Sequence, residues 1–294
     1  MTTLLAPKVY LNGLFVAREE ACVPVTDRGL LFGDSVYEVV PAYGGRLFRA
    51  EQHITRLDRS LGAIRMSNPL DHGQWLAVLE ELVSQLDGAD QYAYLQVTRG
   101  AYPGRSHAIP AEVSPTVMAF ASRLPEPDPR IAAGGVSAIT LEDIRWMRCD
   151  IKATTLLANV LGHSQAREEG ADEAIFVREG KAIEGTASNL FIVSSGLLIT
   201  PPKSQWLLPG VTRDLVIELA EQAGLPYAEA NISVLDLEAA EEVWLTSSTR
   251  EVMPVTRLNG KPVGNGTPGP YWHRMRELYA ACKVHLRSGE ECRS

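Results

Sequence analysis

Residues 145–152 read Arg145-Trp146-Met147-Arg148-Cys149-Asp150-Ile151-Lys152 and belong to the most informative feature of this chain. About thirty residues later the chain continues with Ile183-Glu184-Gly185-Thr186-Ala187-Ser188-Asn189. The first stretch ends in an amine, Lys152, and the second contains a carboxylate, Glu184. Pyridoxal phosphate chemistry needs both groups, because an amine holds the cofactor aldehyde as a Schiff base and a carboxylate keeps the pyridine nitrogen protonated. Taken singly, each residue also fits a plainer interpretation, a salt-bridged surface lysine or a glutamate in a hairpin.

The composition indicates a globular protein with a small-molecule partner. The sequence has 294 residues, of which 45% are hydrophobic, enough for one large domain or two of ordinary size. A net charge of -8 argues against nucleic-acid binding, which depends on clustered Lys and Arg. The sequence has neither an export signal nor an apolar run of membrane-spanning length, so we expect a cytoplasmic protein and no membrane partner. The spacing of the cysteines predicts neither a disulfide framework nor a metal site; they are Cys22, Cys149, Cys282 and Cys292.

The first part of the chain is expected to be a mixed α/β domain. Alternating apolar residues and turn pairs predict strands, and apolar residues at helical spacing predict helices. The strands are expected at 8–11, 14–16, 35–43, 46–48, 91–98 and 116–122, and the helices around 54–64 and 76–86. Alternate prolines in 124–129 remove hydrogen-bond donors and force extended backbone, which is typical of a linker. We predict an N-terminal domain over 1–123, a linker over 124–134 and a C-terminal cofactor-binding domain over 135–294.

The second part is expected to alternate helices with short strands. Apolar residues predict a helix that closes at Gly170, carried by Leu156, Leu157, Val160 and Leu161. Short strands are expected between residues 173 and 200, broken at two turns. A second amphipathic helix around Leu215 is expected to stop at Gly224, followed by a strand at 242–246.

A phosphate site is predicted where Leu208-Pro209-Gly210-Val211-Thr212-Arg213 leads into a helix. The amides of Val211 and Thr212 should be first-turn donors without a helical partner, and these bind anions. Ser247-Ser248-Thr249 offers hydroxyls at a strand end, and Arg56 offers a charged donor. An ordinary helix cap, a polar turn and a solvated arginine are the plainer alternatives.

Arg105-Ser106-His107 is a candidate substrate site. In extended backbone, residues two apart point to the same side, so Arg105 and His107 can converge on one carboxylate. A wet surface loop would carry the same residues. Tyr37, on a predicted strand, faces either a cleft or the core.

Taken together, these segments resemble the fold-type IV pyridoxal phosphate enzymes, and most closely the D-amino acid transaminases. The resemblance spans nearly the whole chain. Its segments are 27–38, His53-Ile54-Thr55-Arg56, Arg105-Ser106-His107, Asp150-Ile151-Lys152, 184–189, 209–213 and Ser247-Ser248-Thr249. It implies a two-domain α+β or α/β fold and an aminotransferase that moves an amino group from a D-amino acid to a 2-oxo acid.

The resemblance also implies roles for single residues. Lys152 is then the Schiff-base lysine and general base, and Glu184 the partner of the pyridine nitrogen. The phosphate is gripped by Arg56, Val211, Thr212, Ser247 and Ser248, and Leu208 packs against the ring. The resemblance further implies a homodimer in which Arg105 and His107 reach the neighbouring active site and, with Tyr37, hold the substrate carboxylate.

Departures from the family pattern leave the substrate open. The loop has an extra residue at Pro103-Gly104, and Thr186-Ala187-Ser188 replaces a serine run. Branched-chain L-aminotransferases, (R)-amine transaminases and aminodeoxychorismate lyase share the lysine and the glutamate. A protein that binds pyridoxal phosphate without catalysis is an alternative from another class. Of these, the D-amino acid reaction is favoured by the Arg-x-His pair.

Overall fold

The computed structural model describes residues 5–88, 90–126 and 128–290, which form two compact units. The first unit contains residues up to 125 together with 151–155 and 286–289, and the second contains the rest. The change of unit after Pro125 falls inside the predicted linker. Part of that segment is helix α4 (Pro129–Gly134), capped by Asp128. Two short segments after the linker, 151–155 and 286–289, also belong to the first unit. A division of the chain at a single linker does not describe this, so the domain limits stay a prediction.

The first unit is built on a six-stranded antiparallel sheet. Its order is β2-β1-β6-β5-β3-β4, from β1 (Lys8–Leu11), β2 (Leu14–Ala17), β3 (Ser35–Tyr43), β4 (Arg46–Leu47), β5 (Gln91–Thr98) and β6 (Thr116–Arg123). All six strands predicted for this part are confirmed. Asn12 and Gly13 join β1 to β2 with φ values of 49° and 95°, as a tight hairpin turn requires.

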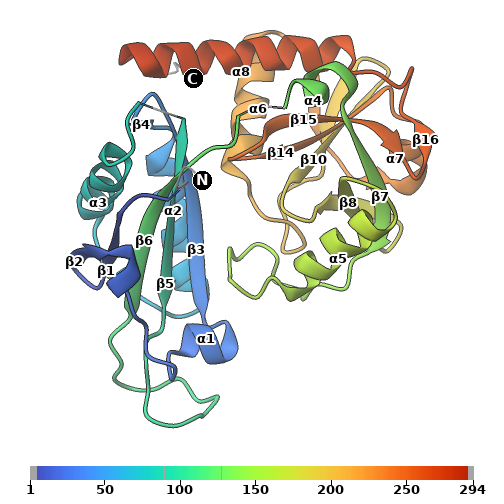
Figure 1. The fold of residues 1–294 in the computed structure, drawn as a ribbon. Coiled ribbons are helices and arrows are strands. Elements are labelled where there is room, and N and C mark those ends of the chain that lie inside the picture. Colours follow the sequence, from blue (N-terminus) through green and yellow to red (C-terminus); the bar gives the residue numbers. More distant parts are fainter. Residues whose placement is uncertain (1–4, 89, 127, 291–294) are drawn as a thin grey trace. The chain divides into compact units, whose positions relative to one another are not determined.

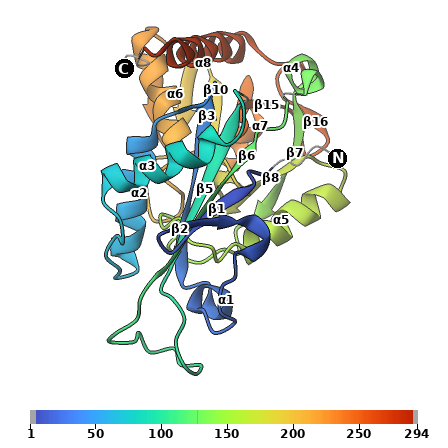
Figure 2. The ribbon, with the colours of Figure 1, turned by 60° about the vertical axis from the view of Figure 1, so that its left-hand side comes forward.

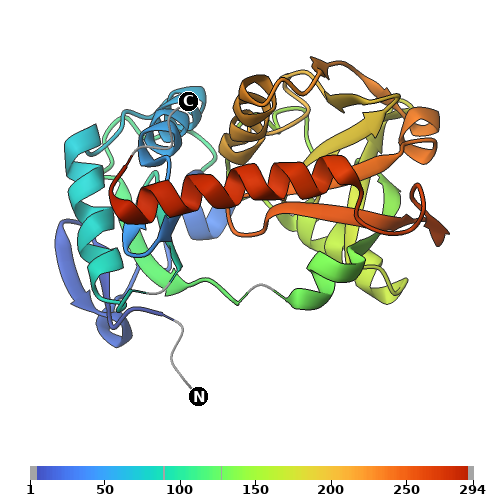
Figure 3. The same cartoon turned by 90° about the horizontal axis from the view of Figure 1, so that it is seen from above.

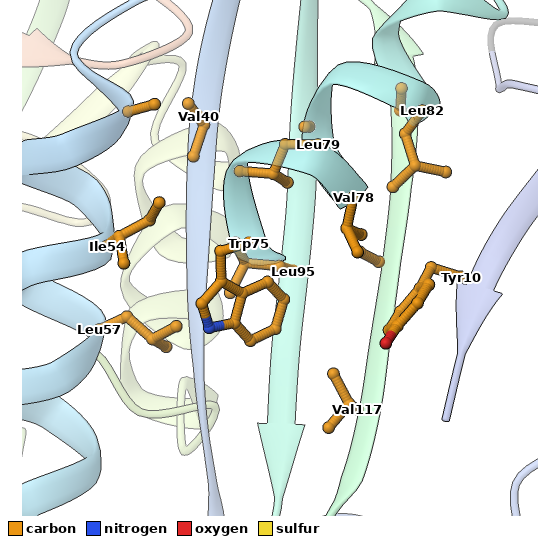
Figure 4. Close-up of a cluster of buried hydrophobic side chains, with 14 of the residues drawn as sticks. Tyr10, Val40, Ile54, Leu57, Trp75, Val78, Leu79, Leu82, Leu95 and Val117 are labelled. Atoms are coloured by element: carbon orange, nitrogen blue, oxygen red, sulfur yellow. The ribbon is translucent and has the colours of Figure 1, made fainter. Parts of the chain in front are cut away.

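Two helices cover one face of this sheet, α2 (Ala50–Ala63) and α3 (His72–Ser84) (Figures 1 and 2). Trp75 and Leu79 of α3 and Leu57 of α2 are fully buried against the strands (Figure 4). Burying a side chain of this size contributes roughly 1.5–3 kcal/mol. Two further elements precede β3, the single turn η1 (Arg18–Glu20) and the short helix α1 (Arg28–Phe32).

The second unit is built on a larger mixed sheet in the order β12-β11-β10-β14-β15-β7-β8-β9-β13, with β16 paired to β15. Asn189 of β10 also pairs with Glu184 of β9, so the strands from β10 through β14, β15, β7 and β8 to β9 form a closed ring. The strands are β7 (Val136–Glu142), β8 (Glu173–Arg178), β9 (Lys181–Gly185), β10 (Asn189–Ser194), β11 (Leu197–Thr200), β12 (Tyr227–Glu229), β13 (Ile232–Ser233), β14 (Glu242–Ser247), β15 (Glu251–Leu258) and β16 (Lys261–Pro262). Ile175, Leu190 and Leu245 are fully buried in its core.

The helices of the second unit are α4, α5 (Leu157–Glu168), α6 (Val211–Gln222), α7 (Val234–Glu238) and α8 (Pro270–Ser288), although the last three residues of α8, 286–288, belong to the first unit. Figure 3 shows α8 as one continuous helix. Its N-terminal amides at Tyr271 and Trp272 donate to the buried Glu242 carboxylate at 2.9 and 2.8 Å. Within the described residues, no helix has both the length and the apolar character that crossing a membrane demands.

One prediction about this unit is confirmed with an unexpected exposure, and one is corrected. Helix α5 forms where it was predicted, but Leu157, Val160 and Leu161 are 71%, 60% and 52% exposed. Their spacing marks an apolar face that the core of this chain does not cover. Cys282 on α8 is disulfide-bonded, which the cysteine spacing did not indicate, whereas Cys22 and Cys149 are free.

Candidate active site

Lys152 lies on the short return of chain that belongs to the first unit. The Tyr37 amide donates to the Lys152 carbonyl at 3.0 Å, and the Lys152 amide donates to Ser60 Oγ at 3.2 Å. The Lys152 ammonium lies 4.1 Å from the centre of the Tyr37 ring. Within the described part of the chain Lys152 has no ion pair, so it is not the salt-bridged surface lysine of the plainer interpretation. The backbone is fixed while the amine remains available.

Tyr37 is held by a stack of aromatic rings on the sheet. Its ring stacks on Tyr94 with centroids 5.6 Å apart, and Tyr94 stacks on Phe120 at 5.0 Å. The side chain is half-buried and faces Lys152 rather than the hydrophobic core. The structure therefore brings the predicted lysine and the predicted tyrosine together.

Arg56 is buried on α2 and paired with Glu38 of β3. Its Nε and Nη2 donate to the two Glu38 oxygens, each at 2.7 Å, and His53 Nδ1 contacts Glu38 Oε2 at 2.8 Å. Burial raises the pKa of Glu38, but the charge and hydrogen bonds of Arg56 and His53 outweigh it and lower that pKa to about 2. Arg56 is thus not the solvated helix arginine of the plainer interpretation.

Arg105 and His107 are exposed on the loop between β5 and β6, and both rest on one ring. The Arg105 guanidinium lies 5.1 Å from the centre of the Phe32 ring, and the His107 ring meets it edge-on at 5.3 Å. The two side chains therefore lie on the same support, and their convergence on one carboxylate stays a prediction.

Glu184 is a buried carboxylate on β9 of the second unit. Its Oε1 forms an ion pair with Arg145 Nη1. Its Oε2 accepts from the Leu208 amide and from Asn189 Nδ2, both at 3.1 Å. The backbone amide of Leu208 thus places this residue next to Glu184.

Arg145 is shared between Glu184 and Asp143, and Asp143 also pairs with Arg178 at 3.0 Å. Arg145 Nε and Nη2 donate to the two oxygens of Asp143, each at 2.9 Å. Burial raises the pKa of Glu184, and the charge and hydrogen bond of Arg145 only partly oppose this, while Asp143 adds to the rise. A cationic partner would stabilise the ionised carboxylate. A protonated pyridine nitrogen is such a partner, so the donor set around Glu184 fits the predicted cofactor.

Asn189 joins this carboxylate to the predicted phosphate site. Its Nδ2 also donates to the Leu208 carbonyl at 2.8 Å. A Cβ on Gly210 would lie 1.9 Å from Asn189 Oδ1, so only glycine permits this approach. Gly210 is the N-cap of α6 and supplies no side-chain cap, which leaves the first amides of the helix, at Val211 and Thr212, for another acceptor.

The hydroxyl cluster lies at the end of the neighbouring strand. Ser247 is the last residue of β14, Ser248 begins the turn to β15, and both are half-buried. Asn189 pairs with Thr246 across the two strands, and Thr246 Oγ1 is buried without a partner in the described structure. Uncapped amides and hydroxyl groups thus lie on either side of Asn189, a donor set suited to a phosphate.

Arg145 and Asn189 are site residues to which sequence reasoning assigned no role, although both stand in the two motifs. Each of the two residues has a local sequence feature that could have indicated a role. Arg145 is a charge between Ile144 and Trp146, and Asn189 is a polar residue directly before the apolar strand residues 190–193. The partner of Asn189, Glu184, becomes apparent only from the pairing of β9 with β10.

Comparison with known proteins places these residues in a family. Residues 35–258 match the amino-transferase class IV family. The chain is 41% identical over 263 residues to a D-alanine aminotransferase of Bacillus licheniformis, covering 90% of this chain and 92% of that protein. It is 38% identical over 274 residues to a D-alanine aminotransferase of Listeria monocytogenes serotype 1/2a (strain 10403S), covering 92% and 94%.

Solved structures agree in fold. A branched-chain amino acid aminotransferase of Escherichia coli is 28% identical with a TM-score of 0.85, covering 97% of this chain and 96% of that one. A branched-chain aminotransferase of Thermoproteus uzoniensis with norvaline is 29% identical with a TM-score of 0.85, covering 95% of each chain. The predicted two-domain fold-type IV class is confirmed. This chain therefore belongs to the class IV aminotransferases.

Proposed function

We propose that this protein is a pyridoxal phosphate-dependent D-amino acid transaminase, which transfers the amino group of a D-amino acid such as D-alanine to a 2-oxo acid. Relatives 41% and 38% identical over about nine-tenths of the chain are D-alanine aminotransferases, which supports this substrate class. The observation that carries the choice is the meeting of Arg105 and His107 on the Phe32 ring. Two donors held on one support suit a single α-carboxylate.

In this proposal the chain supplies an amine and a carboxylate to the cofactor. When bound, pyridoxal phosphate supplies an electron-accepting ring. Lys152 would hold the cofactor through its amine until the substrate amine replaces it. The freed Lys152 amine would then remove the substrate Cα proton as general base and deliver it to the cofactor carbon as general acid. Glu184 keeps the pyridine nitrogen protonated, which in turn compensates the buried carboxylate.

The same proposal assigns the remaining predicted residues. The phosphate is held by Arg56, the amides of Val211 and Thr212, and the hydroxyls of Ser247 and Ser248. Leu208 packs against the ring, and Tyr37 helps hold the substrate carboxylate. The helix start without a side-chain cap at Gly210 supports the phosphate assignment, and the contact of Lys152 with the Tyr37 ring supports a place for Tyr37 beside the substrate.

The enzyme is proposed to be a cytoplasmic homodimer in which the 105–107 loop serves the neighbouring subunit. The exposed face of α5 supports association with a second copy, because Leu157, Val160 and Leu161 form an apolar strip that is favourable to cover.

The deciding experiment compares wild type with Arg105→Ala on D-alanine, L-leucine and the carboxylate-free amine (R)-1-phenylethylamine. Absorbance follows the conversion of the bound cofactor from its pyridoxal to its pyridoxamine form. The wild type should react with D-alanine and not with L-leucine. Removing a charge-assisted hydrogen bond typically costs about 1.5–3 kcal/mol, so Arg105→Ala should raise KM for D-alanine by one to two decades.

The amine serves as the internal control, because it has no carboxylate for Arg105 to bind. Its rate, where detectable, should not fall comparably in Arg105→Ala. A wild type that prefers L-leucine would make the protein a branched-chain aminotransferase, the activity of its structural neighbours. A holoprotein inert toward all three compounds would support cofactor binding without transamination.

A further inference from the structure

The short helix α1 is bound to the stem of the loop that joins β5 to β6, and Figures 1 and 2 show the two side by side. The Arg28 amide donates to the Gly100 carbonyl at 2.9 Å. Asp27, which caps α1 through the Gly29 amide at 2.7 Å, also accepts from Thr116 Oγ1 at 2.6 Å. Both ends of the loop are therefore tied to the start of α1.

Arg28 extends this attachment from the stem to the middle of the loop. Its side chain is buried, and its Nε donates to Asp34 Oδ2 at 2.9 Å. Its Nη1 donates to the Ser106 carbonyl at 2.7 Å. Asp34 is itself fixed by Arg99, whose Nε and Nη2 donate at 2.7 and 3.0 Å. The Ser106 carbonyl is thus held by a guanidinium whose own direction is set by a carboxylate.

Phe32, at the end of α1, supports the side chains on either side of Ser106. Its ring lies 5.1 Å from the Arg105 guanidinium and 5.3 Å from the His107 ring centre. The Arg28 guanidinium lies 4.9 Å from the same ring. Arg105 and His107 are otherwise exposed, so without this support they would sample many rotamers.

We propose that Arg28 and Phe32 are positioning residues for substrate recognition. Arg28 fixes the loop backbone at Ser106, and Phe32 keeps Arg105 and His107 directed at one carboxylate. The inference rests on the proposed function, which makes this pair the carboxylate site. Ordering two such side chains in advance removes an entropic cost from substrate binding, so its loss should appear in KM rather than in kcat.

Arg28→Gln and Phe32→Leu test the two contacts, and Arg130→Gln is the matched control. Arg130 also pairs with an aspartate, Asp128, and undergoes the same substitution, but it lies on α4 of the second unit and takes no part in attaching the loop. Two readouts are taken on the holoenzyme, KM and kcat for D-alanine and pyruvate, and amide hydrogen exchange of residues 103–109.

Arg28→Gln and Phe32→Leu should each raise KM about tenfold and leave kcat within about threefold of wild type, because only pre-ordering is lost. Both should speed exchange at 103–109, and Arg130→Gln should change neither readout. If Arg28→Gln fails to fold, KM of Phe32→Leu decides.

Two results overturn the inference while leaving the proposed function intact. One is faster exchange with an unchanged KM, and the other is an equal KM rise in Arg130→Gln. A wild type inactive on D-alanine instead overturns the proposed function, and the positioning role with it.

Discussion

Glu38 in the first unit and Glu184 in the second are both buried and both paired with an arginine, yet their pKa values move in opposite directions. Arg56 donates to both oxygens of Glu38, and together with His53 it lowers the pKa to about 2 in spite of burial. Glu184 receives only one nitrogen of Arg145, whose other nitrogens serve Asp143, and burial raises its pKa.

The ionised form of Glu38 is favoured by side chains of this chain, whereas the ionised form of Glu184 is not. Arg56 and His53 stabilise the ionised form of Glu38, so this carboxylate can contribute to the stability of the first unit. Burial of Glu184 outweighs its pairing with Arg145, so the charged form of this carboxylate is disfavoured in the folded chain. Carboxylates with pKa values perturbed in this way cluster at functional sites.

The largest effect is expected at Lys152, whose ammonium lies against the Tyr37 ring in the first unit. Lys152→Ala should lower turnover on the order of 10⁴-fold or more, because it removes both the holding amine and the acid-base group. Borohydride reduction followed by peptide mapping should find pyridoxyl on Lys152 in wild type and none in the variant. Label on Lys181 or Lys203 would reject the assignment.

Glu184→Gln should come next, lowering kcat about 10²- to 10³-fold while the protein keeps its cofactor, since a pre-oriented charge at the reacting ring is lost. Stopped-flow absorbance of both half-reactions measures this. Glu242→Gln, which removes another buried carboxylate of the second unit, should leave the rate of the folded enzyme unchanged. Unchanged rates in Glu184→Gln would reduce Glu184 to a structural residue.

Glu38→Gln should act on stability instead. The drop of the Glu38 pKa from 4.5 to about 2 corresponds to about 3 kcal/mol of unfolding free energy above pH 4.5. Because the folded pKa is the lower one, this contribution is lost as the pH falls from 4.5 through 2. Urea unfolding of wild type and variant at several pH values checks the prediction, with the exposed Glu51→Gln as control. A variant as stable as wild type at pH 7 would contradict it.

A smaller effect is expected from the phosphate donors. Thr212→Ala combined with Ser248→Ala should weaken cofactor affinity about ten- to a hundredfold, since two hydroxyl hydrogen bonds are lost. Turnover at saturating cofactor should change little. Cofactor retention on dialysis is the measurement, with the exposed Thr249→Ala as control. Equal retention by the double variant and wild type would exclude this placement.

The smallest expected effect is a pH dependence of the thermal stability of the cofactor-free protein. Since burial raises the pKa of Glu184 above its ordinary value of 4.5, its unfavourable contribution is absent below 4.5 and grows as the pH rises through the raised value. Glu184→Gln, or saturation with pyridoxal phosphate, should flatten that decline in thermal unfolding. A decline that persists in the variant would assign it to another group.

The local patterns of the sequence predicted most elements of the fold. The Asn12-Gly13 turn and the Gly210 helix start follow from backbone chemistry that adjacent residues determine. The apolar strip of α5 was predicted as a helix face, but periodicity does not tell what covers such a face. The return of residues 151–155 depends on the pairing of Val36 with Ala153, a distant contact that no local pattern encodes.

The residues of the candidate site likewise fall into those that the sequence could predict and those that it could not. Lys152 and Glu184 could be proposed because their chemistry is specific and their motifs are ordered along the chain. Asn189 and Arg28 could not, because their importance lies in the carbonyls they hold, at Leu208 and Ser106. A side chain that acts through a distant backbone group leaves no signature in sequence spacing.

The approach of Gly210 to Asn189 constrains the mutational paths open to this enzyme. An alanine at 210 collides with the amide oxygen of Asn189, whereas a smaller side chain at position 189 removes this collision. The two substitutions are therefore order-dependent: the change at 189 must precede the change at 210. In directed evolution, libraries that randomise 210 alone should return glycine, and only paired libraries can reshape this end of α6.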